Sequence, residues 1–288
     1  MKKQNKALVI RILLIAALLV LVLSLAACGG RKPADDLPDD ISQGEGEFRF
    51  LNPLGPPEEL GILLDAPNFL DQIAEMYELN SDTVGWLFVP NTSVNDAVVW
   101  YPGDQNEFYL RRDKFKRSSR EGCYYADFRC TFGGYAEGLS RNTTIYGHNM
   151  DLNDSPDAPQ FSQLLRYLNQ DFAEANPYIF FSIREEDLVW EVFAVFYTTV
   201  NLPYNTPDMS NDQFMNLINE VTKRSEYIYD VDVTANDKIL TLSTCTYAFT
   251  PGVYPNDYRY VVMARLVQDG ELFKERASLQ KNPSPKDP

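Results

Sequence analysis

The sequence predicts a mainly β protein whose strands close, or nearly close, into a barrel with a few helices around it. Short apolar or alternating runs, bounded by Gly, Pro, Asn and Asp, recur along most of the chain. Only three segments carry the apolar periodicity of a helix, and no internal repeat is evident. About eight strands with so few helices fit a barrel better than a doubly wound α/β sheet.

The expected helices differ in how their starts are marked. The N-terminal helix runs from Asn68, which follows a proline and can cap, to about Leu79. A second covers about 161–168, where three leucines share one side. The third begins at Ser210, because Ser210-Asn211-Asp212-Gln213 has the form of a capping box.

The expected strands follow one another between these helices. Each is a short run that ends at turn-forming residues, and we interpret all of them as strands of one barrel. They are Gly85–Val89, Ala97–Trp100, Gly122–Phe128, Thr143–Tyr146, Tyr178–Ile183, Leu188–Thr198, Lys238–Leu242 and Tyr260–Leu266.

The first 28 residues have the composition of a signal peptide or membrane anchor. Basic residues open the segment, and an uncharged apolar run follows from Ile12 to Ala27. Leu25-Ala26-Ala27-Cys28 resembles a bacterial lipobox, so Cys28 is a candidate for lipidation, with an uncleaved signal anchor as the alternative. Both interpretations tether the chain to the cell membrane and place the remainder on its extracellular side.

The rest of the chain divides by composition. Residues 29–57 are rich in Gly, Pro, Asp and Glu and are expected to form a flexible linker. The folded domain is expected over 58–278, which is long enough for one substantial core. The proline-rich residues 279–288 are expected to be a disordered tail.

The charge and residue counts exclude several classes of protein. The chain has 41 Asp and Glu against 26 Lys and Arg, for a net charge of −15, which argues against a nucleic-acid partner. Four cysteines in 288 residues do not make a disulfide scaffold. The single histidine excludes a multi-histidine metal centre, and the carboxylates lack metal-ligand spacing. No metal or cofactor is therefore expected.

Three segments carry residues suited to acyl transfer. One expected strand runs into His148, another ends near Cys245, and Arg259 opens a third. A thiolate is the reactive form of cysteine, and a neighbouring imidazole can take its proton. An arginine stays charged and can hold a carbonyl or the oxyanion that forms when the thiolate attacks.

Each residue type also has a purely structural interpretation. A cysteine in an apolar strand is usually a small buried hydrophobe, which is our interpretation of Cys123 and Cys130. Their spacing of seven places them on opposite faces of a straight strand, so no disulfide between them is expected. A lone histidine is more often structural, and an arginine at a strand edge is usually solvated. The combination of the three types is what favours a catalytic site.

Five segments together resemble the signature of class B sortases over about residues 68–268. The resemblance also includes their order, with a membrane anchor, a helix and a barrel before the histidine, cysteine and arginine. The segments are Asn80-Ser81-Asp82-Thr83-Val84-Gly85-Trp86-Leu87, Asn106-Glu107-Phe108-Tyr109-Leu110, Tyr146-Gly147-His148-Asn149-Met150, Leu242-Ser243-Thr244-Cys245 and Arg259-Tyr260-Val261-Val262.

The resemblance implies an eight-stranded sortase barrel and a cysteine transpeptidase. Cys245 would attack the carbonyl that follows the threonine of a C-terminal sorting signal on a secreted protein, His148 would give a proton to the leaving amine, and Arg259 would bind the substrate or the oxyanion. An amino group of a cell-wall peptide or of a pilin would resolve the thioacyl intermediate. The substrate-binding residues that the resemblance suggests are Asn106, Leu110, Ser243, Thr244 and Tyr204.

Two features depart from that family, and two alternatives remain. The segment Thr246–Tyr258 is long, which leaves the preferred sorting signal open, and the lipobox-like Cys28 is unusual for a family that mostly uses a plain anchor. Another exported cysteine peptidase, such as a papain-like hydrolase or an L,D-transpeptidase, is one alternative, although it needs a different order or a third group that orients the histidine. A non-catalytic surface lipoprotein that binds a ligand is the other.

Overall fold

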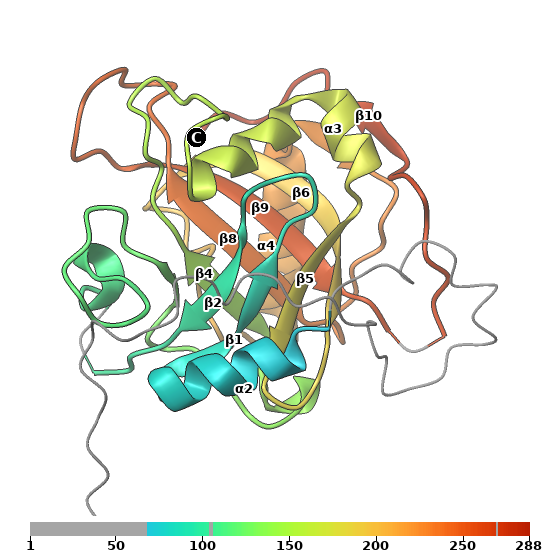
Figure 1. Ribbon diagram of the computed structural model, residues 1–288. Helices are drawn as coiled ribbons and strands as arrows, with labels where there is room; N and C mark the ends of the chain where they lie inside the picture. The colour runs from blue at the N-terminus through green and yellow to red at the C-terminus, as the bar shows by residue number, and fades with distance from the viewer. Residues whose placement is uncertain (1–67, 104–105, 269) are drawn as a thin grey trace, which may run out of the picture. The chain divides into compact units, whose positions relative to one another are not determined.

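The computed structural model describes residues 68–103, 106–268 and 270–288 (Figure 1). The expected anchor at 1–28 with Cys28, the expected linker at 29–57 and the first ten residues of the expected domain lie outside these residues. In chain order the elements are α2 (Leu70–Leu79), β1 (Thr83–Phe88), β2 (Asn95–Val99), η3 (Tyr109–Arg111), β3 (Tyr124–Ala126), η4 (Ala136–Gly138), β4 (Asn142–Tyr146), η5 (Phe161–Leu168), α3 (Gln170–Ala175), β5 (Tyr178–Ile183), β6 (Val189–Thr199), α4 (Asn211–Arg224), β7 (Tyr227–Tyr229), β8 (Ile239–Cys245), β9 (Tyr258–Leu266) and β10 (Leu279–Lys281).

Eight strands form a closed barrel in the order β1-β2-β3-β4-β8-β9-β6-β5, and β1 closes the ring by pairing with β5. The pairs β2–β3 and β4–β8 are parallel, and the other pairs are antiparallel. These are the eight runs expected from the sequence, so the predicted fold class is confirmed. The C-terminal end of β8 differs from the expected strand, because β8 continues to Cys245 instead of ending at Leu242.

Alternation along β8 decides which side chains fill the barrel and which face outward. Leu240 and Leu242 lie in the largest apolar cluster, which takes side chains from all eight strands and fills the barrel. Ile239 instead packs in a second cluster with Phe214 of α4, which covers the outside of the barrel (Figure 1). The odd-numbered residues of β8, including Cys245, therefore face outward.

The three expected helices are present, with differences in detail. Leu70 donates its N–H to Oδ1 of Asn68 at 3.0 Å at the start of α2. The capping box of α4 is formed, since the Ser210 side chain accepts from the N–H of Gln213 and the Gln213 side chain accepts in return. The segment η5 is a 3₁₀ helix followed by the short α3. Within the described ranges, no helix combines the length and the apolar character needed to cross a bilayer.

The C-terminal residues correct one expectation. We expected a disordered tail over 279–288, but β10 pairs antiparallel with β7, with Leu279 opposite Tyr229. Beyond that strand, the N–H of Asn282 donates to the carbonyl of Glu226 at 2.9 Å. The prolines did not prevent this pairing, because all three follow the strand, where no ladder N–H is required of them.

Candidate active site

Strand register places His148, Cys245 and Arg259 side by side on the outer face of the barrel. Cys245 of β8 lies directly opposite Arg259 of β9 in the antiparallel ladder. In the parallel ladder of β4 and β8, Tyr146 pairs with Ser243, and two further residues along each strand lead to His148 and Cys245. Because side chains two residues apart share a face, the three predicted residues converge at one end of the barrel.

Three hydrogen bonds continue that register beyond the end of β4. The N–H of Gly147 donates to the carbonyl of Ser243 at 3.4 Å, and Oγ1 of Thr244 donates to the carbonyl of Gly147 at 2.8 Å. Nδ2 of Asn149 donates to the carbonyl of Cys245 at 3.1 Å. The residues on both sides of His148 are thus bonded to the strand that carries the thiol.

A backbone carbonyl orients the imidazole. Nε2 of His148 lies 2.7 Å from the carbonyl oxygen of Leu110, at η3. Since a carbonyl only accepts hydrogen bonds, Nε2 carries the proton of this contact and Nδ1 is left for proton exchange with a reacting group. The contact supplies the third, orienting group of a cysteine–histidine site, although no side chain provides it.

Gly122 makes room for the imidazole and for that carbonyl. A Cβ at Gly122 would lie 3.1 Å from Cδ2 of His148 and 3.3 Å from the carbonyl oxygen of Leu110. The φ of Gly122 is also +63°, a conformation that L side chains rarely adopt. A side chain here would therefore strain the backbone, and it would also require the ring or the carbonyl to shift by a few tenths of an ångström.

The thiol of Cys245 lies in a partly buried position with charges on two sides. Burial raises the pKa of the Cys245 thiol above its ordinary value; the Arg259 guanidinium acts against this shift, and the Asp154 carboxylate adds to it. The thiol is consequently mostly protonated at neutral pH, and its activation requires a base. His148 is the only histidine in the chain and lies beside it.

Arg259 keeps most of its hydrogen-bonding capacity free. Its Nη1 donates to the carbonyls of Asn256 at 3.0 Å and Tyr258 at 2.8 Å. No carboxylate in the described part of the chain forms an ion pair with Arg259, and the N–H groups on Nε and Nη2 have no partner there. That free edge of the guanidinium can donate a fork of two hydrogen bonds to a carbonyl oxygen or an oxyanion.

The predicted substrate-binding residues of β8, and Tyr204 of the loop between β6 and α4, lie beneath the surface. Ser243 is 1% exposed and Tyr204 is 3% exposed, and their hydroxyl groups lie 2.9 Å apart. Thr244 is buried as well, with its hydroxyl bonded to Gly147. In this structure the three residues are thus buried, with their hydroxyl groups bonded within the protein.

Asn106 and Leu110 lie at the other side of the site. The amide of Asn106 accepts from the N–H of Phe128 at 2.7 Å and donates to Asp127 at 3.2 Å. Although burial opposes it, hydrogen bonding to Arg129 lowers the pKa of Asp127, so the carboxylate stays charged at the centre of this network. Leu110 contributes its carbonyl to His148, a contact that the sequence prediction did not include.

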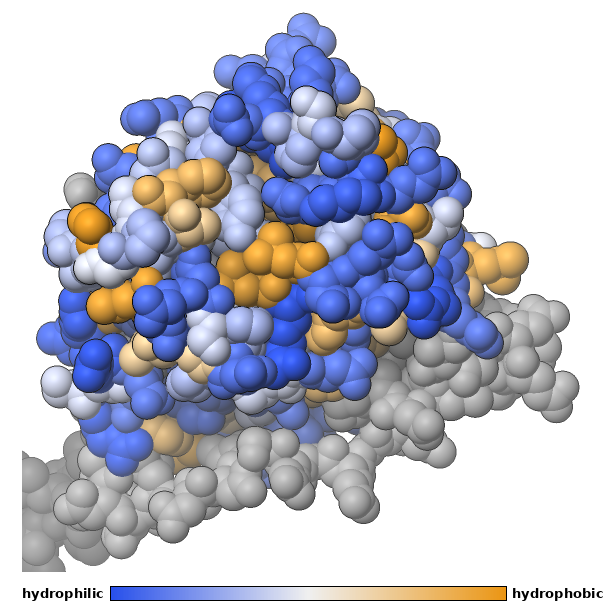
Figure 2. Space-filling view, turned by 90° about the horizontal axis from the view of Figure 1, so that it is seen from above, coloured by the Kyte–Doolittle hydropathy of each residue, from blue (hydrophilic) through white to orange (hydrophobic). Residues whose placement is uncertain are grey.

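The loops after His148 and after Cys245 form an apolar rim beside the thiol. The loops meet where the N–H of Gly252 donates to the carbonyl of Leu152 at 3.4 Å. Leu152, Phe249, Val253 and Tyr254 are all exposed there. In the view from above, apolar side chains gather in separate patches on a largely hydrophilic face (Figure 2).

The other two described cysteines are free and buried, as expected of small core residues. Cys130 is 1% exposed. Cys123 lies two residues before Tyr125, which pairs with Tyr146, so it is on the same outer face as His148. Among the described residues, no three His, Cys, Asp or Glu side chains gather in a way that could hold a metal ion.

Comparison with known proteins gives one consistent result. Residues 89–267 match the family model of the sortase domain. The chain is 32% identical over 198 residues to Sortase B of Staphylococcus aureus, covering 68% of this chain and 75% of that protein. It is also 32% identical over 176 residues to Sortase B of Listeria monocytogenes, covering 61% and 67%.

A solved structure agrees with these relatives. The Staphylococcus aureus sortase B–substrate complex matches with a TM-score of 0.59 and 31% identity, covering 69% of this chain and 86% of that one. The family-model match at residues 89–267 includes His148, Cys245 and Arg259. A thiol, an imidazole and a free guanidinium at one end of this barrel have the chemistry needed for acyl transfer.

Proposed function

The chain belongs to the class B sortases and is a cysteine transpeptidase of that kind, and from this premise we propose that it cleaves a C-terminal sorting signal after threonine and joins the new carboxyl end to an amine. The observation that carries the proposal is the row formed by His148, Cys245 and Arg259. A single outer face of the barrel offers a nucleophile, a proton carrier and an oxyanion donor to one peptide bond.

In the first half of the reaction, Cys245 transfers its proton to Nδ1 of His148 and the sulfur attacks the carbonyl carbon of the threonine. The carbonyl oxygen becomes an oxyanion and accepts hydrogen bonds from the free edge of Arg259. When the C–N bond breaks, the imidazolium gives its proton to the leaving amine. The products are a thioester on Cys245 and a free C-terminal fragment.

In the second half, an amine of the acceptor attacks the thioester carbon. Neutral His148 takes the proton that the amine loses, and the thiolate of Cys245 leaves and is protonated again. The net result exchanges one amide bond for another. We propose that the acceptor is an amino group of a cell-wall peptide or of a pilin.

The chemistry of the substrate is consistent with the surroundings of the thiol. The homologous Staphylococcus aureus protein has been solved as a substrate complex. In this chain the apolar rim of Leu152, Phe249, Val253 and Tyr254 borders the thiol and suits the apolar residues of an extended peptide. We further propose that residues 1–28 tether the enzyme to the cell membrane with the barrel on the extracellular side.

The decisive experiment is a search for the thioester. Short peptides of the NPxTx and xPxTG types are mixed with the protein, and covalent adducts are identified by mass spectrometry and mapped to a cysteine. We expect an adduct on Cys245 that disappears in Cys245→Ala. Cys130→Ala is the matched control, because it removes a buried free thiol far from the row and should keep the adduct. An adduct that persists in Cys245→Ala contradicts the proposed nucleophile.

A further inference from the structure

We propose that Asp154 is a positioning residue of the active site, whose carboxylate holds the residues after Cys245 against the loop after His148. The inference rests on the proposed function, since it assigns a role within the same reaction. Asp154 lies in the loop between β4 and η5, a region in which no periodicity or motif marks an individual residue.

Three donors from two separate segments converge on this carboxylate. Nδ2 of Asn149 donates to Oδ1 at 2.7 Å, and Oγ1 of Thr246 donates to Oδ2 at 2.7 Å. The N–H of Tyr247 lies 3.0 Å from Oδ1 and 2.9 Å from Oδ2. One donor comes from the residue after His148 and two come from the residues directly after Cys245.

Asn149 extends the connection to the thiol strand itself. The same Nδ2 that reaches Asp154 also donates to the carbonyl of Cys245 at 3.1 Å. Oδ1 of Asn149 accepts from the hydroxyl of Ser162 at 2.9 Å, which ties the loop to η5. Asp154 therefore completes a set of hydrogen bonds that holds the carbonyl of Cys245 and the two residues after it.

The backbone of Asp154 adopts an uncommon conformation to reach these donors. Its φ is +58°, in the left-handed region, where aspartate is tolerated better than most residues with a Cβ. Local strain of this kind persists where the surrounding contacts determine it. The loop thus bends so that the carboxylate faces Thr246 and Tyr247.

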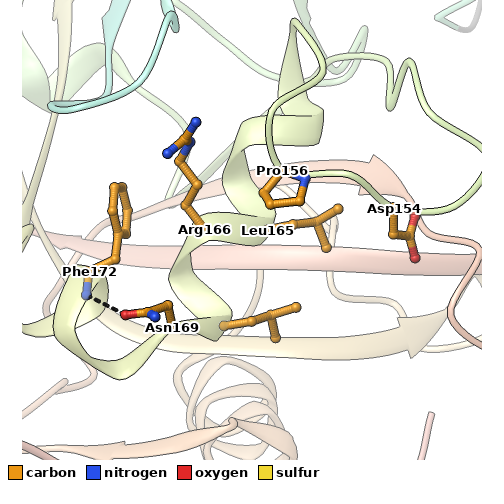
Figure 3. A pocket seen from close by; sticks show the side chains of 7 residues that line it. Asp154, Pro156, Leu165, Arg166, Asn169 and Phe172 are labelled. Carbon is orange, nitrogen blue, oxygen red and sulfur yellow. Dashed lines mark hydrogen bonds between the residues drawn. The ribbon is translucent and has the colours of Figure 1, made fainter.

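No cation neutralises this carboxylate within the described residues. Figure 3 shows Asp154 beside Pro156 at one end of a pocket of about 550 Å³, with Phe172 and Asn169 at the other end. The cation that lines the pocket, Arg166, is paired with Asp157 at 2.8 Å. The charge of Asp154 is thus satisfied by hydrogen bonds and remains within electrostatic range of the thiol.

The charge of Asp154 also acts on the pKa of the Cys245 thiol, and this effect can be measured separately from the packing of the loop. Asp154 raises the pKa of the Cys245 thiol, as does burial, while Arg259 lowers it. The phenols of Tyr125, Tyr204 and Tyr247 also lie within electrostatic range of the thiol, and His148 lies beside it in the register of the strands. Removal of the Asp154 charge should therefore shift the thiol titration to lower pH, which a merely structural residue would not do.

The test measures the alkylation rate of Cys245 against pH in the full chain, read by mass spectrometry of the Cys245 peptide, together with turnover of a sorting-signal peptide. In Asp154→Asn we expect the alkylation midpoint to move to lower pH. We also expect kcat to fall about 10–100-fold with little change in KM, because small misplacements of reacting groups are costly. Asparagine offers one oxygen where two now accept, so at least one donor loses its partner.

Two further variants separate the charge from the hydrogen bonds. Thr246→Val removes one donor and keeps the charge, so turnover should fall while the alkylation midpoint stays in place. Asp157→Asn is the matched control, since it removes an equal charge from the same loop at a carboxylate that is 82% exposed, and neither quantity should change.

The outcomes are unambiguous for both proposals. An unmoved midpoint in Asp154→Asn, or turnover within twofold of the wild type, overturns the role of Asp154. Failure of the wild type to cleave any sorting peptide overturns the proposed function instead. In that event the alkylation midpoints still test whether Asp154 acts on the thiol. If Asp154→Asn does not fold, full turnover in Thr246→Val overturns the positioning role.

Discussion

Two arginines on one strand have opposite surroundings. Arg259 and Arg265 both belong to β9, and an even spacing puts them on the same face. At the start of the strand, Arg259 bonds only to two backbone carbonyls and keeps a free guanidinium edge. At the other end, Arg265 is 8% exposed and lies within a network of ion pairs.

The network around Arg265 joins three segments of the chain. Arg265 contacts Glu191 of β6 at 3.0 Å and forms two hydrogen bonds of 2.7 Å with Glu271. Lys274 contacts the other oxygen of Glu191 at 2.9 Å. Residues beyond β9 are attached to the barrel by these contacts, and each charge is compensated by another.

The contrast teaches that compensation of charge, rather than residue type or position in a strand, separates a structural arginine from a chemical one. A guanidinium that is buried and paired with carboxylates, like that of Arg265, stabilises the fold but is not available to a substrate. A guanidinium with a free edge contributes less to the fold and is available to an oxyanion. Substitution of the two residues should therefore produce opposite patterns of loss.

The largest effect is expected for Arg259→Ala, in activity. Loss of a positioned oxyanion donor typically costs about 10²–10⁴-fold in rate. The free energy of unfolding should change by less than about 0.5 kcal/mol, because no ion pair is broken. Peptide turnover checks the loss of activity, and chemical denaturation of the same preparation checks the free energy of unfolding. Arg259→Lys keeps the charge but not the two-pronged donor geometry, so its turnover should lie between those of the wild type and Arg259→Ala. Near-normal turnover in Arg259→Ala contradicts the comparison.

The next effect is expected for Arg265→Ala, in stability. Removal of one partner leaves Glu191 buried with only Lys274 to pair it, and such losses cost about 3–5 kcal/mol in the free energy of unfolding. Denaturant titration measures this change, and turnover per folded molecule should stay near the wild-type value. The double variant Arg265→Met/Glu191→Leu should recover much of the loss, because it removes both buried charges. A stable Arg265→Ala would show that the network adds little.

The smallest effect concerns the ionisation of the thiol. Since the positive charge of Arg259 lowers the pKa of Cys245, its removal makes the thiolate less favourable. In Arg259→Ala the midpoint of Cys245 alkylation should therefore move to higher pH, the direction opposite to that expected for Asp154→Asn. Arg265→Met is the control and should leave the midpoint where it is. If the alkylation midpoint moved in both Arg259→Ala and Arg265→Met, the two arginines would not differ in their effect on the thiol.

Much of this architecture could be predicted from the sequence. The apolar runs that end at turn-forming residues predict the barrel strands, and the capping box predicts the start of α4, because both are local signals. The residue types of His148, Cys245 and Arg259 favour acyl transfer by their chemistry alone. These features depend on neighbours in sequence, or on chemistry that a single residue type carries.

What could not be predicted depends on contacts between distant segments. Arg259 and Arg265 look alike in the sequence, since Glu191 lies 74 residues from the arginine it neutralises. The pairing of β10 with β7 joins a proline-rich tail to a strand of three residues, and neither has a strong pattern. Asp154 belongs to an irregular loop, and its importance appears only when Thr246 is seen beside it.

The contact between Leu110 and His148 limits what a conventional mutational survey can discover in this enzyme. The oxygen that holds the ring belongs to the main chain, so every substitution at position 110 retains it. An alanine scan would accordingly report a two-residue dyad plus an arginine and would overlook the third participant. Only replacement of the peptide link itself, for instance by an ester through chemical ligation, or displacement of the loop by a bulkier residue at Gly122, could expose its contribution.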